Sequence, residues 1–283
     1  MLSRLGRDEQ AGPSQAIAYH LAMSACANCG TGLTGTYCSD CGQRASFHLD
    51  LHDFLHDATH EFLHFDSKIV RTFRLLLFKP GALTTEFVAG KRASTISPIR
   101  LYLVTSAIFF WIFFTFGTRI GAIKFHVGKS PETITIHTGD AAIQHGLKKV
   151  QRNPEVLPEA LAHSVPKAMF LLMPISALLL WSLYRHANPY YVAHLYFAIH
   201  MHAFTFLVLS VMALLKATEN GIMTGLSALL MLWIFVYVFL AQRRFYDVKW
   251  LAVVLKGAVS MTAYFVLLGA MMIGIVMLTL ATV

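Results

Sequence analysis

The sequence predicts an all-helical membrane protein in which five transmembrane helices follow a small four-cysteine ribbon and an amphipathic interfacial helix. Three observations lead to this fold class. Of the 283 residues, 56% are hydrophobic and only 13% are charged, which is too apolar for a soluble domain of this length. Five stretches are long enough to cross a bilayer core, and two closely spaced cysteine pairs precede them.

The cysteine pairs predict one bound zinc ion. Cys26-Ala27-Asn28-Cys29 and Cys38-Ser39-Asp40-Cys41 hold all 4 cysteines of the chain. Four thiolates at this spacing suit a tetrahedral Zn²⁺, and because they close its coordination shell we expect the metal to be structural. Thiolates that stay reduced for zinc are typical of the cytosol, so the N-terminus is expected to be cytoplasmic.

The predicted spans are apolar runs of about the 20 residues that a bilayer core requires. They cover approximately 101–120, 167–184, 195–215, 222–241 and 251–282. The second is short and contains Pro174, and the fifth carries Lys256 where a lysine can reach the interface. The predicted organisation is a disordered tail (1–23), a zinc ribbon (24–45), a cytoplasmic interfacial helical region (46–98), the first span (99–120), an outer loop (121–166) and four further spans (167–283).

Basic residues beside the short loops predict the orientation. Arg243, Arg244 and Lys249 lie between the fourth and fifth spans, and much of the remaining positive charge lies at or before Arg100. Since positive charge favours the cytoplasmic side, we expect a multi-pass inner (cytoplasmic) membrane protein with its N-terminus inside and its C-terminus outside. The cysteine argument gives the same orientation independently.

A histidine-rich helix is predicted at about 47–78. Its apolar residues fall on one arc about 100° wide, so the helix should lie along the membrane interface or the ends of the spans. On its polar side the histidines recur every fourth residue: His48, His52, His56, His60 and His64. Neighbours at this spacing share a helical face and could clamp a metal ion, although a merely hydrophilic helix face explains them equally well.

Three more histidines lie near the start of the third span, at His194, His200 and His202. An ionisable residue there usually faces the bundle interior. One interpretation of His194 and His202 is a hydrogen bond between helices.

The other interpretation is a second divalent metal, because both histidine groups would lie on the cytoplasmic side. Its candidate ligands are His52, His56, His60, His194, His200 and His202.

Basic residues also gather just before the first span, at Lys91, Arg92 and Arg100. They can be a cytoplasmic charge collar, in which each cation contributes about 1 kcal/mol against anionic lipid. Alternatively they bind a phosphate or lipid head group, since Gly90 beside two cations would let such a group approach the backbone.

These motifs together resemble the bacterial membrane-protein family known as domain-of-unknown-function family 3667. The resemblance rests on Cys-x-x-Cys-Gly, Tyr37-Cys-x-x-Cys-Gly-Gln43, the histidine-rich helix, Phe65-Asp66-Ser67-Lys68, Pro80-Gly81, Glu86-x-x-x-Gly90-Lys91-Arg92 and Pro98, in this order. It extends from about residue 24 to the last span. It implies the architecture described above and no established activity.

Several function classes are disfavoured. There is no phosphate-binding glycine loop, nucleophile elbow or dinucleotide fingerprint in the sequence. A nucleic-acid partner is not expected, because no Lys or Arg lies between Cys26 and Cys41. The spans lack internal acidic clusters and an evident inverted repeat, which disfavours a secondary transporter. Movement of protons or metal ions through the bundle would need a polar path, and the fourth and fifth spans offer almost none beyond Thr224, Ser227, Ser260 and Thr262.

Two functions are favoured. The first is a docking or sensing module, in which the ribbon and the interfacial helix meet a cytoplasmic protein partner and membrane lipids. The alternative is a metal-dependent enzyme that acts on a lipid or polyprenyl-phosphate head group through the histidine cluster.

Overall fold

The computed structural model describes residues 25–45, 68–116, 141–152, 156–218 and 220–282. The chain forms two compact units, Met1–Ser97 and Pro98–Val283. The secondary structure of the described residues consists of helices and two isolated β-bridges, Ala25↔Gly32 and Tyr37↔Arg44. The histidines at 48–64 lie outside the described residues.

In the first unit, the residues described after the ribbon form two short helices, α3 (Lys68–Phe78) and α4 (Ala82–Val88). They are separated by Lys79, Pro80 and Gly81, because proline and glycine end a helix, and Gly81 adopts a left-handed φ of 73°. An ion pair joins the helices, in which Arg71 Nη2 lies 2.8 Å from Glu86 Oε2. Leu75, Leu76 and Leu83 form the buried side of this helix pair.

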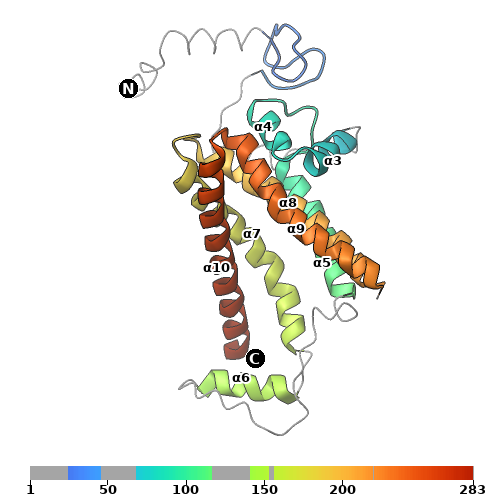
Figure 1. The fold of residues 1–283 in the computed structure, drawn as a ribbon, viewed down its shortest axis with the longest axis vertical. Helices are drawn as coiled ribbons and strands as arrows, with labels where there is room; N and C mark the ends of the chain where they lie inside the picture. Colours follow the sequence, from blue (N-terminus) through green and yellow to red (C-terminus); the bar gives the residue numbers. More distant parts are fainter. Residues whose placement is uncertain (1–24, 46–67, 117–140, 153–155, 219, 283) are drawn as a thin grey trace. The chain divides into compact units, whose positions relative to one another are not determined.

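Among its described residues, the second unit holds five helices that are long and apolar enough to cross a membrane (Figure 1). They are α5 (Pro98–Phe116), α7 (Val156–Tyr184), α8 (Tyr191–Lys216), α9 (Gly221–Tyr246) and α10 (Trp250–Thr282). In hydrocarbon only a helix can satisfy all its backbone groups within one segment, which is why these runs are helical. The predicted class, an all-helical multi-pass membrane protein with five spans, is confirmed.

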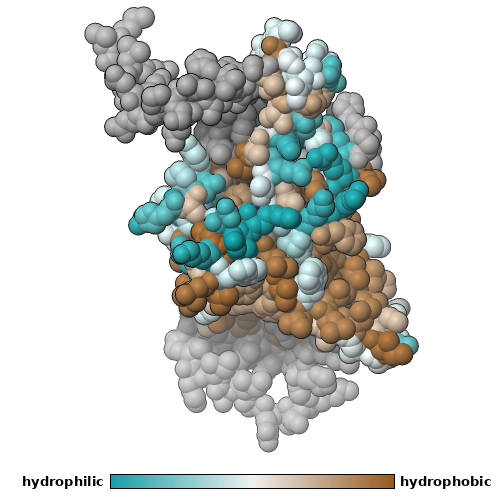
Figure 2. Space-filling model, turned by 45° about the horizontal axis from the view of Figure 1, so that its top comes forward, coloured by the Kyte–Doolittle hydropathy of each residue, from teal (hydrophilic) through white to brown (hydrophobic). Residues whose placement is uncertain are grey.

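Helix α8 lies at the centre of this unit. Its apolar window is 67% buried, against 17% for α9 and 11% for α10, and it packs against α5, α7 and α9. The outward faces of α9 and α10 carry exposed large apolar side chains such as Leu232, Leu251 and Val266. Figure 2 shows such brown, hydrophobic surface over the helices. Lipid therefore has to cover most of α9 and α10, whereas α8 is covered by protein.

The ends of the spans differ in places from the sequence expectation. Helix α7 begins at Val156, although the sequence analysis places a loop up to residue 166. It passes through Pro158 in its first turn, where the backbone amides lack helical partners anyway, and through Pro166 and Pro174 in its interior. Helix α6 (Ala141–Arg152) also forms within the region predicted as a loop, and Gly146 lies against the backbone of Leu280 near the end of α10.

The turn between α9 and α10 is shorter than predicted. Arg243 and Arg244 belong to the last turn of α9, where cations complement the negative end of the helix dipole. Arg243 Nη1 also lies 2.9 Å from the carboxylate of Asp247, whose left-handed φ of 46° ends the helix. The connection is therefore reduced to Asp247, Val248 and Lys249.

Candidate metal centre

The four cysteine sulfurs converge on one point. Within the described residues they form the one group of three or more potential metal ligands, and their Sγ atoms all lie within 4.8 Å of one another. Cys26 Sγ lies 3.5 Å from Cys41 Sγ, and Cys29 Sγ lies 3.4 Å from Cys38 Sγ. A tetrahedral ion about 2.3 Å from each sulfur would hold the sulfurs about 3.8 Å apart. The cluster is therefore compatible with a single bound metal.

Two equivalent turns position these sulfurs. In the first, Cys26 N–H donates to Thr31 O and Gly30 N–H donates to Cys26 O, both at 2.8 Å. The second repeats the pattern twelve residues later, with Cys38 N–H bonded to Gln43 O and Gly42 N–H bonded to Cys38 O. Each turn thus presents both of its cysteines from one side, and the pair of turns encloses the metal position.

A polar link joins the two turns beside the sulfurs. Cys29 Sγ hydrogen-bonds to Thr31 Oγ1 (3.4 Å), and the Thr31 hydroxyl donates to Asp40 Oδ2 in the second turn (2.6 Å). Hydrogen bonding with Thr31 lowers the pKa of Cys29 to about 6, whereas burial raises the pKa of Cys41 to about 11. A metal must displace the proton of a thiol such as Cys41, so its binding should weaken as the pH falls.

The two glycines after the cysteine pairs give a first prediction. Gly30 and Gly42 have φ values of 82° and 70°, a conformation that costs other residues roughly 1–2 kcal/mol. Gly30→Ala and Gly42→Ala should each weaken metal binding about five- to thirtyfold, because the turn must adopt this conformation to bind. Competition with a chelating dye measures the affinity. Gly35→Ala is the control, since Gly35 has open space around it and no left-handed φ; equal affinities for all three variants would contradict the prediction.

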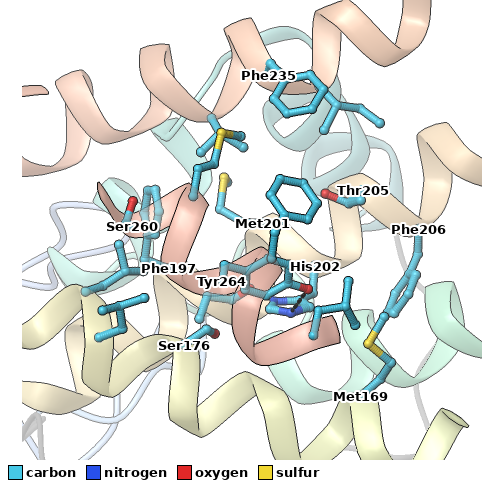
Figure 3. A pocket seen from close by; sticks show the side chains of 18 of the residues that line it. Met169, Ser176, Phe197, Met201, His202, Thr205, Phe206, Phe235, Ser260 and Tyr264 are labelled. Atoms are coloured by element: carbon cyan, nitrogen blue, oxygen red, sulfur yellow. Dashed lines mark hydrogen bonds between the residues drawn. The ribbon is translucent and has the colours of Figure 1, made fainter. Parts of the chain in front are cut away.

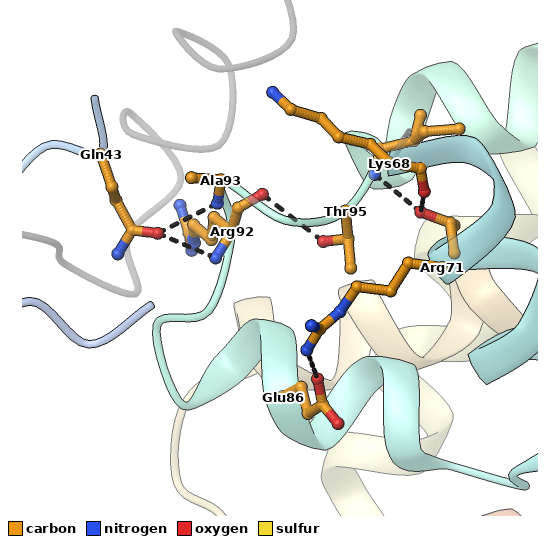
Figure 4. A network of polar contacts seen from close by, with 9 residues as sticks. Gln43, Lys68, Arg71, Glu86, Arg92, Ala93 and Thr95 are labelled. Atoms are coloured by element: carbon orange, nitrogen blue, oxygen red, sulfur yellow. Dashed lines mark hydrogen bonds and ion pairs between the residues drawn. The ribbon is translucent and has the colours of Figure 1, made fainter. Parts of the chain in front are cut away.

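The ribbon is fastened to the rest of its unit by Gln43 (Figure 4). The Gln43 Nε2 amide donates to Gly90 O at 2.6 Å, while Oε1 accepts from the backbone N–H groups of Arg92 (3.1 Å) and Ala93 (3.0 Å). One side chain thereby binds three backbone groups of the Gly90–Ala93 turn, which follows α4. The backbone carbonyl of Gln43 also accepts from Cys38 N–H in the second cysteine turn. Gln43 therefore belongs both to the metal site and to the contact with the Gly90–Ala93 turn.

The Gly90–Ala93 turn is shaped for this contact. Gly90 has a φ of 91°, and a Cβ atom there would lie 3.1 Å from the Cβ of Ala27, between the first two cysteines. The guanidinium carbon of Arg92 lies 4.6 Å from the centre of the Phe87 ring, a cation–π contact. The turn continues to Ile96, whose N–H donates to the Thr72 hydroxyl of α3 at 2.9 Å. The hydrogen bonds of Gln43 and Ile96 therefore connect the ribbon, through this turn, to α3.

Loss of the Gln43 side chain should release the turn from the ribbon. In Gln43→Ala the three hydrogen bonds disappear, and backbone groups that were partly buried lose their partner, at about 1–3 kcal/mol. We expect faster hydrogen–deuterium exchange at the amides of Arg92 and Ala93, with the metal retained. Thr34→Ala, at an exposed site in the ribbon, is the control. Unchanged exchange in Gln43→Ala would refute the contact.

Two of the α8 histidines, His194 and His202, are buried and form hydrogen bonds to other helices. His194 Nε2 lies 2.9 Å from Asn188 O, and because a carbonyl only accepts, this nitrogen carries the proton. His194 Nδ1 therefore accepts from the Tyr246 hydroxyl of α9, 2.8 Å away. His202 is arranged in the opposite tautomer: Nδ1 donates to Ala198 O (2.8 Å) and Nε2 accepts from the Tyr264 hydroxyl of α10 (3.1 Å).

The other residues predicted for a binding site lie at separate places in the part of the chain that the structure describes. His200 is fully buried in α8, whereas His52, His56 and His60 lie outside the described residues. Lys91 is exposed in the first unit, and Arg100 is half-buried in α5 of the second unit. Arg92 lies on Phe87 and is held at its backbone by Gln43.

Sequence reasoning missed the roles of Gln43 and Thr31. The signal for Gln43 was present, because Gln43 directly follows the second Cys-x-x-Cys-Gly motif. Its partner turn, however, lies 47 residues further along the chain, and no periodic pattern connects the two. Thr31 and Asp40 resemble ordinary polar loop residues until the turns bring them together.

Comparison with known proteins gives a match to a family model. Residues 66–110 match the model of a family described as "Protein of unknown function (DUF3667)". No curated protein and no solved structure matches the chain. The matched segment covers α3, α4, the Gly90–Ala93 turn and the first part of α5, and the cysteines lie ahead of it. The predicted resemblance to domain-of-unknown-function family 3667 is therefore confirmed over residues 66–110.

Proposed function

We propose that this membrane protein uses its four-cysteine ribbon, closed by zinc, as a docking module for a cytoplasmic protein partner. The observation that carries the proposal is the Gln43 contact. It joins the metal-ligand cluster to the turn that leads in sequence to Pro98, where the first span begins. A ribbon held in this way has a defined orientation on its unit, which reduces the entropy that a binding partner must overcome.

Zinc is the proposed metal because of the donor set. Cys26, Cys29, Cys38 and Cys41 supply four sulfur ligands, which zinc binds in structural sites, and a complete shell leaves no open position for chemistry. When bound, zinc would hold the two turns together and so contribute the folding energy that a ribbon of about twenty residues cannot supply from a core.

The ribbon exposes residues suited to a protein interface. Tyr37 is 64% exposed and is paired across the β-bridge with Arg44, also exposed. Tyrosine and arginine are among the residue types enriched at protein interfaces. Tyrosine contributes a large rigid surface and arginine a planar charge. A protein partner fits this surface better than nucleic acid, since Arg44 is the one basic residue of the ribbon at 25–45 and would attract phosphates only weakly.

The proposal is tested by photocrosslinking in intact cells. A photoreactive amino acid that replaces the exposed Ser39 should crosslink to one partner protein. The crosslinked product should have the same mass in every experiment, and mass spectrometry identifies the partner. The adduct should be lost in Tyr37→Ala, which leaves the metal in place, and in Cys38→Ser, and it should persist in Thr34→Ala. No adduct, or an adduct unaffected by Tyr37→Ala, would contradict the docking proposal.

The docking proposal is also favoured over an enzyme by the histidines of α8. Both ring nitrogens of His194 and of His202 are engaged in hydrogen bonds, so binding a metal would require breaking one of them. This arrangement is the one expected for histidines that join helices.

We further propose that the ribbon lies on the cytoplasmic side of an inner membrane. The basic last turn of α9, with Arg243 and Arg244, and Lys249 after it would then also be cytoplasmic. Alkaline phosphatase fused after Tyr246 should be inactive, and the same enzyme fused after Thr282 should be active, since it folds only outside the cytoplasm. The reverse pattern would contradict the orientation.

A further inference from the structure

A cavity of about 290 Å³ lies inside the membrane-spanning unit (Figure 3). All five long helices contribute to its wall, for example Phe109 of α5, Met169 of α7 and Met201 of α8. It lies among helices of membrane-crossing length, and the core of a bilayer around such helices is hydrocarbon. Either water or an apolar part of a lipid could therefore fill this cavity.

The wall offers little to water. Most of its polar groups are engaged with the protein. His202 Nε2 accepts from the Tyr264 hydroxyl, and the Ser176 and Ser260 hydroxyls donate to the carbonyls of Met173 and Gly257. Gln242 Oε1 accepts from the Tyr184 hydroxyl, and Thr205 is the remaining polar residue of the wall. A buried water needs two to four polar partners, and a cavity lined by apolar groups stays dry. Apart from these pairs, the wall consists mainly of aliphatic, aromatic and methionine side chains.

The cavity is open toward the lipid side of the bundle. Of its lining residues, Met231 on α9 is 42% exposed and Phe265 on α10 is 50% exposed. These two helices are the least buried of the five, and Figure 1 shows them diverging from their connection at Asp247–Lys249. An apolar chain can therefore enter from the bilayer between α9 and α10.

The lining is adaptable as well as apolar. Met169, Met201, Met231 and Met261 contribute thioethers from four different helices. Methionine is unbranched and polarisable, so it fits surfaces of irregular shape such as a bent hydrocarbon chain. At about 30 Å³ per water-sized group, the cavity has room for roughly ten such groups, which is the size of the distal part of an acyl chain.

We propose that this cavity binds one acyl chain of a membrane phospholipid, which enters laterally between α9 and α10. The site is separate from the ribbon and independent of its metal. The cavity wall, rather than the polar groups of the lipid, determines recognition, so binding should depend on free volume within the cavity. The hydrogen bond between His202 and Tyr264 holds α8 and α10 together on one side of the bound acyl chain.

The test uses the full-length protein in vesicles of phosphatidylethanolamine and phosphatidylglycerol that contain a phosphatidylethanolamine with a diazirine at the end of one acyl chain. After illumination, mass spectrometry locates the labelled residues. Met201 is the reporter, because it lines the cavity and is only 8% exposed. Labelling of Met201 is expected in the unmodified protein. Labelling confined to exposed residues such as Leu232 would overturn the proposal.

Two matched pairs of variants show whether the label enters through the cavity. Thr205→Phe places a ring at the cavity wall, whereas Thr262→Phe makes the same change at an exposed site on α10. Leu209→Trp and Leu214→Trp form the second pair on α8, the first at the cavity and the second exposed. Met201 labelling should be lost in the cavity variants that still fold, as judged by thermal unfolding, and retained in both controls. Retention in both cavity variants would overturn the proposal.

Discussion

Cys38→Ser is expected to remove the metal and unfold the ribbon. Cys38 is 3% exposed, and its sulfur lies 3.4 Å from that of Cys29, so it is an interior ligand of the cluster. A structural zinc site contributes roughly 10–16 kcal/mol of binding free energy, which is also the folding energy of such a ribbon. A neutral serine hydroxyl replaces a thiolate poorly, and most of this energy should be lost. Metal analysis of the purified protein should fall from one ion per chain to none.

The control for this variant is the neighbouring residue. Ser39→Ala changes an exposed hydroxyl in the same turn and should leave one metal ion per chain. A metal content that is unchanged in Cys38→Ser would show that the metal is bound elsewhere. The assignment of the four cysteines to one site would then be wrong.

Leu172→Ala is expected to destabilise the membrane bundle by about 2–5 kcal/mol, since a buried leucine that becomes alanine leaves a cavity whose lining loses its contacts. Leu172 lies in α7 and is 1% exposed. Thermal unfolding in one detergent, followed by circular dichroism, measures the loss.

The adjacent residue provides a stringent control. Leu171 is 61% exposed on the lipid-facing side of the same helix. In Leu171→Ala lipid or detergent fills the space of the lost methyl groups, so the change should lie within about 0.5 kcal/mol. Equal destabilisation by the two substitutions would contradict the position of α7 in the bundle.

Local sequence patterns account for much of the fold. The five spans are detectable because membrane-crossing helices require long apolar runs, and Pro80-Gly81 marks the stop after α3 through backbone chemistry alone. The cysteine cluster follows from spacing, since two short turns can direct four sulfurs to one point. The extension of α7 through Pro158 and Pro166 was not predicted. Pro158 lies in the first turn, where no helical hydrogen bond is lost, and packing offsets the bond that is lost at Pro166.

The contacts between distant segments could not be predicted in this way. His194 bonds to Tyr246, 52 residues away, and Gln43 bonds to Gly90, 47 residues away. Neither pair belongs to a repeating pattern, and each depends on how helices or turns pack in three dimensions. The sequence did indicate that His194 would face the bundle interior, which follows from the cost of an ionisable group in lipid. The identity of its partner required the structure.

The central claim is that a bound metal orders the ribbon and thereby fixes the Gly90–Ala93 turn through Gln43. Hydrogen–deuterium exchange at the amides of Arg92 and Ala93 tests this directly, because both donate to Gln43 Oε1. We expect slow exchange in the metal-loaded protein and faster exchange after treatment with a membrane-permeant zinc chelator, at the rate seen in Gln43→Ala. Exchange at these two amides that is indifferent to removal of the metal would contradict the account.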